Sequence, residues 1–428
     1  MNFHDAERLS GLLDAEGYER VDTADAADLV VLNTCSVRER AEEKLYARLG
    51  DLRARAERDE VVLAVTGCVA QQEGEKLLAR EPSIDVVVGT QRMPHLPRLV
   101  DEALAAREPR VETSPRDDVA FPLGIARHSD PVRAWVTIIE GCNEYCAFCV
   151  VPYTRGHERM RPASDIVAET ARAAASGRVE VQLLGQIVNH YVDPADPSCD
   201  FPALLERVSA VPGIVRVRFA SPHPRHVSDR LIAAIRDLPK VAKLLHLPVQ
   251  SGSTRILTAM RRRYTREGYL DLVDRLRASV PDIELSTDII VGFPGETVED
   301  FEETMTLVRR VGFQSIFSFK YSPRPNTLAS KRLPDGVTEG EKTLRIVALQ
   351  ALQREIQLER NHAAVGRTVQ VLADGPSARR QDELAGRTSG NAIVNFPGPT
   401  EMVGQLVAVE ITEGGANSLR GRLASAEL

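Results

Sequence analysis

Residues 134–149 read AWVTIIEGCNEYCAFC. An apolar segment with strand character, Trp135–Ile139, runs directly into three cysteines at positions 142, 146 and 149. Five more apolar segments follow, separated by helical patterns: Val179–Leu184, Val215–Ala220, Leu244–Leu247, Ile283–Val291 and Ser315–Lys320. Serial strand–helix units form parallel sheets. Because six units are too few for a complete eight-stranded barrel, the sequence predicts a partial (β/α)6 barrel with its chemistry at the carboxyl ends of the strands.

A smaller α/β region, residues 1–115, precedes the barrel. Its short, wholly apolar segments lie between helical patterns, at 29–32, 61–65 and 86–88, which is typical of a parallel sheet covered on both faces. Cys35 and Cys68 each follow one of these segments, so we expect them to share the ligand-binding rim of the sheet. A connector rich in proline and charge, at about 106–131, leads to the barrel region at 128–362.

In the last part of the chain, residues 364–428, the alternation of strand and helix patterns ends. A helical pattern over 341–362 ends before Gly366, and short β segments follow at 368–372, 392–396, 406–411 and about 419–423. This spacing predicts a small antiparallel β-barrel. The predicted fold class is therefore α/β: an N-terminal parallel αβ sandwich, a central partial barrel and a C-terminal antiparallel β-barrel.

The composition is that of a soluble globular protein, with 43% apolar and 27% charged residues. No apolar run approaches the ~18 residues of a membrane span, and we expect no secretory leader. Six cysteines without export signals indicate a reducing compartment and metal or catalytic roles, so we expect a cytoplasmic protein. The net charge of −7 still allows RNA binding, because local basic faces occur at 155–161 and 261–263.

The three cysteines of the quoted stretch stand alone, with no fourth cysteine near them in sequence. A structural zinc site needs four ligands, whereas three thiolates suit a [4Fe–4S] cluster that keeps one iron open for a substrate. Phe148, before the third cysteine, can shield one face of such a cluster from water. The alternatives are a zinc site and cysteines that have neither a metal-binding nor a catalytic role.

This cysteine motif is similar to that of the radical S-adenosylmethionine (SAM) superfamily. Further segments extend the resemblance, over essentially the whole chain, to the radical SAM methylthiotransferase family: NTCSVRE (33–39), TGCVAQ (66–71), EGCNEYCAFCVVPYTRG (140–156), LLGQ (183–186), ASPHP (220–224), HLPVQSGS (246–253), STDIIVGFPGET (286–297), FKYSPRP (319–325) and NSLRG (417–421). VVPYTRG together with NFPGP (395–399) favours the members that modify tRNA. The C-terminal barrel resembles a TRAM domain, which binds RNA, and a purely structural cap is the alternative.

The resemblance implies two [4Fe–4S] clusters. Cys142, Cys146 and Cys149 would hold the cluster whose open iron chelates SAM. Cys35 and Cys68 map onto two of the three cysteines that hold an auxiliary cluster in the family.

The third auxiliary cysteine would follow a strand ahead of Met1, so the sheet would also lack a central strand. The explanations are a start assigned too late, a degenerate copy, or a different third ligand. Cys199 is the only spare thiol, and we take it as incidental.

The resemblance also implies contacts with SAM. Gly185 and Gln186 follow the second barrel strand, where the family contacts the SAM amino group. Gln250 is expected to approach SAM or substrate, although it could also belong to a tight turn. Arg155 is expected to meet the SAM carboxylate or an RNA phosphate, since arginine suits both.

The implied reaction is methylthiolation at C2 of N6-isopentenyladenosine at position 37 of tRNA, with SAM as both methyl donor and radical source. The anticodon loop is single-stranded, so the base can be splayed into a pocket. We expect an electron donor such as flavodoxin or ferredoxin, no membrane partner, and a monomer. The alternatives are a threonylcarbamoyl-adenosine or ribosomal-protein substrate and, in another class, a non-catalytic iron–sulfur RNA-binding protein.

Overall fold

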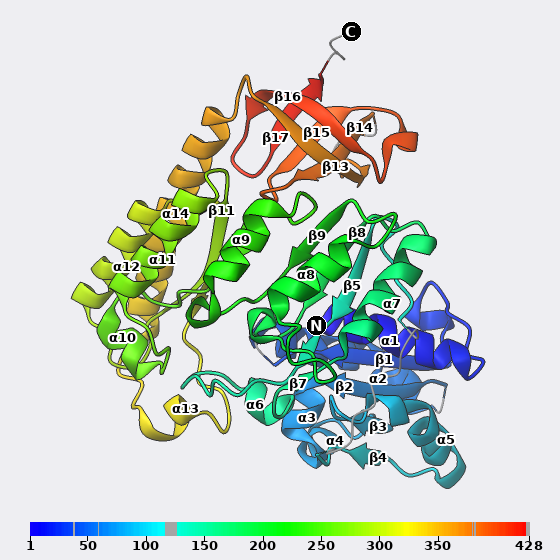
Figure 1. Ribbon diagram of the computed structural model, residues 1–428. Helices are drawn as coiled ribbons and strands as arrows, with labels where there is room; N and C mark the ends of the chain where they lie inside the picture. The colour runs from blue at the N-terminus through cyan, green and yellow to red at the C-terminus, as the bar shows by residue number, and fades with distance from the viewer. Residues whose placement is uncertain (37–38, 59, 116–125, 379, 381, 425–428) are drawn as a thin grey trace. The chain divides into compact units, whose positions relative to one another are not determined.

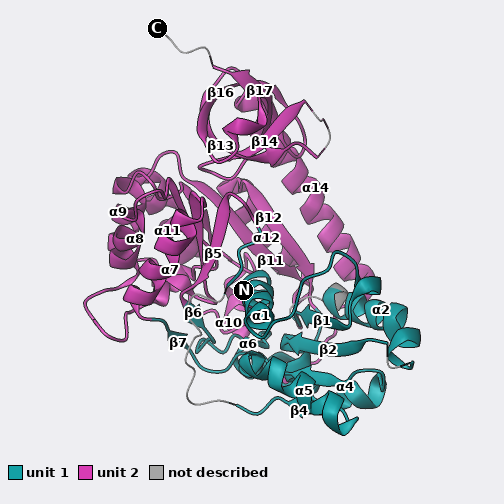
Figure 2. Cartoon of the chain, turned by 90° about the vertical axis from the view of Figure 1, so that its right-hand side faces the viewer, with its two compact units in different colours: residues 1–129, 139–161, 322–331 teal, residues 130–138, 162–321, 332–428 magenta. Residues whose placement is uncertain are grey.

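The computed structural model of the protein describes residues 1–36, 39–58, 60–115, 126–378, 380 and 382–424. Parts of the NTCSVRE segment (37–38) and of the predicted connector (116–125) lie outside this set. The chain divides into two compact units (Figure 2). Unit 1 comprises Met1–Ser129, Ile139–Arg161 and Ser322–Lys331; unit 2 comprises Asp130–Ile138, Pro162–Tyr321 and Arg332–Leu428. The loop with the cysteine triplet thus groups with the N-terminal region, an association that the division into three sequence segments did not anticipate.

Unit 1 contains a parallel sheet with the strand order β1-β2-β3-β4 (Figure 1). β1 pairs directly with β2, from Leu29↔Val62 to Thr34↔Gly67. The two strands are neighbours in this sheet, and the expected loss of a central strand stays a prediction. β4 lies in the stretch predicted as a connector, because an edge strand of three residues is too short to give a periodic pattern. The strands are β1 (Leu29–Thr34), β2 (Val62–Gly67), β3 (Val86–Val88) and β4 (Arg110–Glu112).

Helices cover both faces of this sheet, as the apolar strands predict. Alternate residues of β2 point to opposite faces: Ala64 joins the core under α1 and α5, whereas Leu63 and Val65 join the core under α2, α3 and α4. The cysteine loop adds a small antiparallel hairpin, β6 with β7. The remaining elements of unit 1 are α1 (Asn2–Ala15), η1 (Ala24–Ala26), α2 (Glu39–Ala56), α3 (Cys68–Glu73), α4 (Glu75–Arg80), η2 (Met93–His95), α5 (Leu96–Ala106), β6 (Ile139–Glu140), α6 (Val151–Thr154), β7 (Arg159–Met160) and most of α13 (Leu328–Arg332).

Unit 2 contains all six strands of the predicted partial barrel, each within two residues of its predicted ends. They form two parallel three-stranded sheets, β5-β8-β9 and β10-β11-β12, joined by an isolated bridge between Val217 and Val241. The strands are β5 (Arg133–Thr137), β8 (Glu180–Leu184), β9 (Arg216–Phe219), β10 (Leu244–His246), β11 (Glu284–Val291) and β12 (Ser315–Lys320). The helices that alternate with them are α7 (Ala163–Ala175), η3 (Val188–His190), α8 (Phe201–Ser209), η4 (Pro224–His226), α9 (Asp229–Asp237), α10 (Thr254–Ala259), α11 (Arg266–Ser279) and α12 (Val298–Val311).

The predicted long helix is α14 (Glu339–Ala363), and a closed barrel in the order β13-β14-β15-β17-β16 follows it (Figure 1). The sequence pattern missed β14 because its buried positions include Gly386, where a Cβ would overlap the Leu372 carbonyl oxygen. Among the residues that the structure describes, no helix has both the length and the apolar character to cross a bilayer. The barrel elements are β13 (Thr368–Pro376), β14 (Glu383–Thr388), β15 (Ile393–Pro397), η5 (Thr400–Met402), β16 (Leu406–Gly414) and β17 (Leu419–Leu423).

Candidate functional site

The cysteine triplet lies on a tight loop between β6 and α6. The Cys142 amide donates to the Gly156 carbonyl at 3.2 Å, and the Cys149 amide donates to the Cys146 carbonyl at 3.0 Å. Gly141, with φ +77°, allows this approach because a Cβ there would overlap the His157 carbonyl. Cys142 and Cys146 are buried and Cys149 is half-buried. Burial raises the pKa of the Cys142 thiol to about 11.

The donor set of this loop, three thiols on one short stretch, fits a [4Fe–4S] cluster with one open iron. Within the described ranges, no three histidine, cysteine or acidic side chains converge on a point that one ion could occupy. In a [4Fe–4S] cluster each of three corner irons would take its own thiolate, which Cys142, Cys146 and Cys149 would supply.

A second cysteine pair lies at the carboxyl rim of the sheet in unit 1. Cys35 follows β1 and Cys68 begins α3 after β2, directly beyond the register pair Thr34↔Gly67. A hydrogen bond with the Cys35 thiol lowers the pKa of Cys68 to about 6. The structure therefore places the two thiols side by side, while their role as cluster ligands stays a prediction.

Arg155 connects the triplet loop to this rim. Its Nη2 donates to Asp5 Oδ2 of α1 at 2.5 Å, and both side chains are almost wholly buried. Burial would raise the pKa of Asp5, but the Arg155 guanidinium outweighs it and holds that pKa below its usual range. Asp5 and the Cys68 thiolate in turn raise the pKa of Arg155 against the effect of burial. The predicted contact of Arg155 with SAM or phosphate stays a prediction, because its partner in this structure is Asp5.

Two side chains that donate to backbone carbonyls also hold the triplet loop to the sheet of unit 1. The Thr90 hydroxyl donates to the Thr154 carbonyl, and Gln91 Nε2 donates to the Arg155 carbonyl at 3.0 Å. Both donors follow β3. The triplet loop is therefore held by the same rim that carries the cysteine pair. Sequence reasoning missed Asp5, because a lone acidic residue on an amphipathic helix gives no signal.

The other predicted SAM contacts, Gly185, Gln186 and Gln250, lie in unit 2, at the carboxyl ends of barrel strands. Gly185 and Gln186 follow β8. Gln186 Oε1 is buried and has no hydrogen-bond donor among the described residues, so it fits an amino group as a ligand. Gln250, with φ +73°, makes a parallel bridge to Ile289 of β11. Its backbone therefore has a structural role whatever its side chain binds.

His223, after β9, is a structural residue of the same rim. Its amide donates to Asn189 Oδ1 at 2.8 Å, and Asn189 Nδ2 donates to its carbonyl at 3.0 Å. Burial, reinforced by the nearby Arg262, lowers the pKa of His223 to about 2. The imidazole is therefore neutral across the physiological range, while the backbone of His223 ties the loops after β8 and β9 together.

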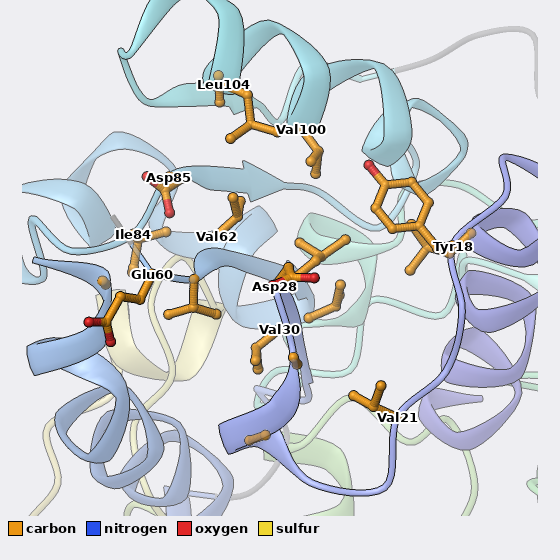
Figure 3. A pocket seen from close by; sticks show the side chains of 18 of the residues that line it. Tyr18, Val21, Asp28, Val30, Glu60, Val62, Ile84, Asp85, Val100 and Leu104 are labelled. Atoms are coloured by element: carbon orange, nitrogen blue, oxygen red, sulfur yellow. The ribbon is translucent and has the colours of Figure 1, made fainter. Parts of the chain in front are cut away.

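A large cavity of about 1490 Å³ in unit 1 lies away from the cysteines (Figure 3). Its lining includes the residues just before each strand, such as Asp28, Glu60 and Asp85. These mark the amino-terminal edge of the sheet, whereas Cys35 and Cys68 lie at the carboxyl edge. Ligands of parallel sheets bind at the carboxyl edge, so this cavity is not part of the cysteine site.

Comparison with known proteins identifies the parts of the chain. Residues 136–308 match the radical SAM superfamily, residues 1–89 match the uncharacterized protein family UPF0004, and residues 363–424 match the TRAM domain. The tRNA-2-methylthio-N(6)-dimethylallyladenosine synthase of Halorhodospira halophila is 47% identical over 100% of this chain and 91% of its own length. The synthase of the same name from Magnetococcus marinus is 46% identical over 99% of this chain and 97% of its own length. The chain belongs to this methylthiotransferase family.

Solved structures agree on the fold. The radical SAM methyltransferase TsrM from Kitasatospora setae superposes with a TM-score of 0.58 at 14% identity, covering 77% of this chain and 72% of TsrM. The cobalamin-dependent radical SAM enzyme OxsB gives a TM-score of 0.53 at 12% identity, covering 83% of this chain and 59% of OxsB. Membership of the methylthiotransferase family confirms the predicted fold class and implies [4Fe–4S] clusters and SAM as the cofactors.

Proposed function

We propose that the protein transfers a methylthio group to C2 of N6-isopentenyladenosine at position 37 of tRNA. The observation that carries this proposal is a single compact unit that joins a three-cysteine loop to a second cysteine pair through Arg155 and Asp5. A methylthiotransferase has two tasks, SAM cleavage and sulfur delivery, and two adjacent cysteine sites suit them. The full-length similarity to synthases with this activity supports the same choice.

The residues have distinct roles in this proposal. Cys142, Cys146 and Cys149 hold the SAM-binding cluster, and Cys35 and Cys68 hold the auxiliary one. When bound, these groups supply an electron for the reductive cleavage of SAM and a sulfur atom for transfer. A hydrogen bond with the Cys35 thiol, and after it the Arg155 guanidinium, stabilise the thiolate form of Cys68 and lower its pKa. Gly185, Gln186 and Gln250 orient SAM from the carboxyl ends of the barrel strands.

The partners follow from the same chemistry. The RNA is bound through its anticodon loop, where a single-stranded base can be splayed out, and the TRAM barrel contributes to this binding. Electrons come from a low-potential carrier such as flavodoxin or ferredoxin. We propose that the enzyme acts as a monomer in the cytoplasm.

The test is anaerobic reconstitution with iron and sulfide, followed by reaction with SAM, a reductant and isopentenyl-containing tRNA. Nucleoside mass spectrometry should show the methylthio product, and 5′-deoxyadenosine should form with it. A variant with all three triplet cysteines changed to alanine should bind less iron and cleave no SAM. Wild-type protein that cleaves SAM but leaves this tRNA unchanged would contradict the substrate assignment.

Parallel reactions separate the alternatives. Modification of threonylcarbamoyl-adenosine tRNA, or of a ribosomal protein, would replace the proposed substrate with that one. RNA binding without SAM cleavage would identify a non-catalytic iron–sulfur protein. The iron content then shows whether the pair at Cys35 and Cys68 holds a cluster, since full loading gives two clusters per chain.

A further inference from the structure

A row of buried charged side chains crosses the amino ends of three strands in unit 2. Arg133 of β5, Glu180 of β8 and Arg216 of β9 are register partners, and Arg218 lies two residues further along β9. The Glu180 side chain has no exposed surface. It pairs with Arg133, accepts from Arg218 Nε at 3.0 Å and lies 3.6 Å from Arg216 Nη1. Three guanidinium groups therefore share one buried carboxylate.

Two of these guanidinium groups, those of Arg216 and Arg218, hold the turn between β14 and β15 of the TRAM barrel. Arg218 donates from Nη1 to the Ser389 carbonyl at 3.0 Å and from Nη2 to the Thr388 carbonyl at 2.6 Å. Arg216 Nη1 donates to the Arg387 carbonyl at 2.8 Å. Glu180 thus orients the two arginines of β9, and they bind three consecutive carbonyls of the turn.

The other three-stranded sheet holds the opposite side of this turn. The Lys243 amide, just before β10, donates to Ser389 Oγ at 2.7 Å. A Cβ at Gly390 would overlap the side chain of Glu284, the first residue of β11, so the turn is pressed against that strand. The turn at 387–391 consequently contacts both three-stranded sheets.

The two sheets have few direct links of their own. Between β9 and the chain entering β10, the described residues make two backbone hydrogen bonds, Val217 amide to Lys240 carbonyl and Ala242 amide to Val217 carbonyl. Both lie at the amino ends of the strands, where the turn sits. The candidate SAM contacts are divided between the sheets: Gln186 follows β8 and Gln250 follows β10.

We propose that the β14–β15 turn of the TRAM barrel clamps the two halves of the partial barrel together, and that Glu180 is the residue that positions this clamp. The TRAM barrel then has a role besides RNA binding: it fixes the distance between the two strand sets that carry Gln186 and Gln250. This distance matters for SAM binding if the proposed function holds, whereas the clamp itself does not depend on that function.

The decisive experiment is hydrogen exchange of the full-length chain, measured by mass spectrometry without cofactors. In Glu180→Gln, residues 240–246 and 387–391 should exchange at least about tenfold faster than in wild type, because a buried ion pair loses its carboxylate. The matched control is Asp274→Asn, which removes an exposed carboxylate that pairs with Arg310 of α12 and makes no contact with the turn at 387–391 among the contacts of the described residues. It should leave the exchange unchanged.

A second, milder variant keeps the clamp testable if Glu180→Gln fails to fold. Ser389→Ala removes the acceptor of the Lys243 amide. Faster exchange should therefore be confined to residues 240–246 and 387–391. In the reconstituted enzyme, Glu180→Gln should raise KM for SAM more than it lowers kcat, with the iron content unchanged. Equal exchange in wild type and both variants would overturn the clamp. Exchange that rises uniformly through unit 2 would overturn it too, because that pattern belongs to general destabilisation.

Discussion

The ion pair between Asp5 and Arg155 gives the sharpest stability prediction. Asp5→Asn keeps the shape of the side chain and an oxygen that accepts from Arg155, but leaves the buried guanidinium without its counter-charge. Removing one partner of a buried pair costs about 3–5 kcal/mol. We expect about 3 kcal/mol, the lower end, because one hydrogen bond remains. Each 1.4 kcal/mol is a factor of ten, so local opening of unit 1 should become about a hundredfold more frequent.

Hydrogen exchange of the cofactor-free chain measures this effect directly, with peptides from α1 and from the cysteine loop at 139–161. The control is Glu60→Gln, which removes an exposed carboxylate paired with Arg58 and should leave the exchange rates unchanged. In a double-mutant cycle, Arg155→Gln should cost less in the Asp5→Asn background than in wild type. If Asp5→Asn exchanges no faster than the control, the pair does not hold the loop to α1.

The pH dependence of the same pair has a definite sign. The folded-state pKa of Asp5 lies below its usual value, so the carboxylate stabilises the fold fully above the unfolded pKa of about 3.9. This contribution is lost as the pH falls through the lower, folded-state pKa. The difference in stability between wild type and Asp5→Asn should therefore be constant near neutral pH and shrink below about pH 4.

Three further predictions concern glycine and cysteine positions. Gly67→Ala should destabilise unit 1 by more than about 1 kcal/mol and lower the iron content of the reconstituted protein. The reason is that Gly67 has φ +96° and that a Cβ there would overlap the Thr34 carbonyl. An unchanged iron content and unchanged hydrogen-exchange rates would contradict this prediction. Cys199→Ala should retain the wild-type iron content, because Cys199 is buried and belongs to unit 2, whereas the other five cysteines belong to unit 1. A loss of iron would make it a ligand. In the cofactor-free chain, a pH titration followed by thiolate absorbance should show a step near pH 6 that Cys68→Ala removes and Cys142→Ala keeps, because their pKa values lie near 6 and 11. The same step in Cys68→Ala would refute the proposed stabilisation of the Cys68 thiolate.

Local patterns were enough to predict the strand–helix order of the chain. Each of the six barrel strands is an apolar run long enough to stand out from its flanking turns, as Ile283–Val291 illustrates. The cysteine spacing in 142–149 identifies its chemistry because one short loop must wrap one cluster. Failures occurred where the pattern was short or interrupted by glycine, as in β4 and in β14 with Gly386.

The sequence by itself determined most of the elements, their order and the cysteines that are the candidates for chemistry, because periodicity and motif spacing are local properties of the chain. Only the tertiary structure decided that the triplet loop belongs with the N-terminal sheet, that Asp5 is the partner of Arg155 and that Glu180 gathers three arginines. These pairings join residues far apart in the chain, up to 150 positions for Arg155 and Asp5. Burial makes them energetically important, since a charge removed from water needs a partner wherever the fold provides one.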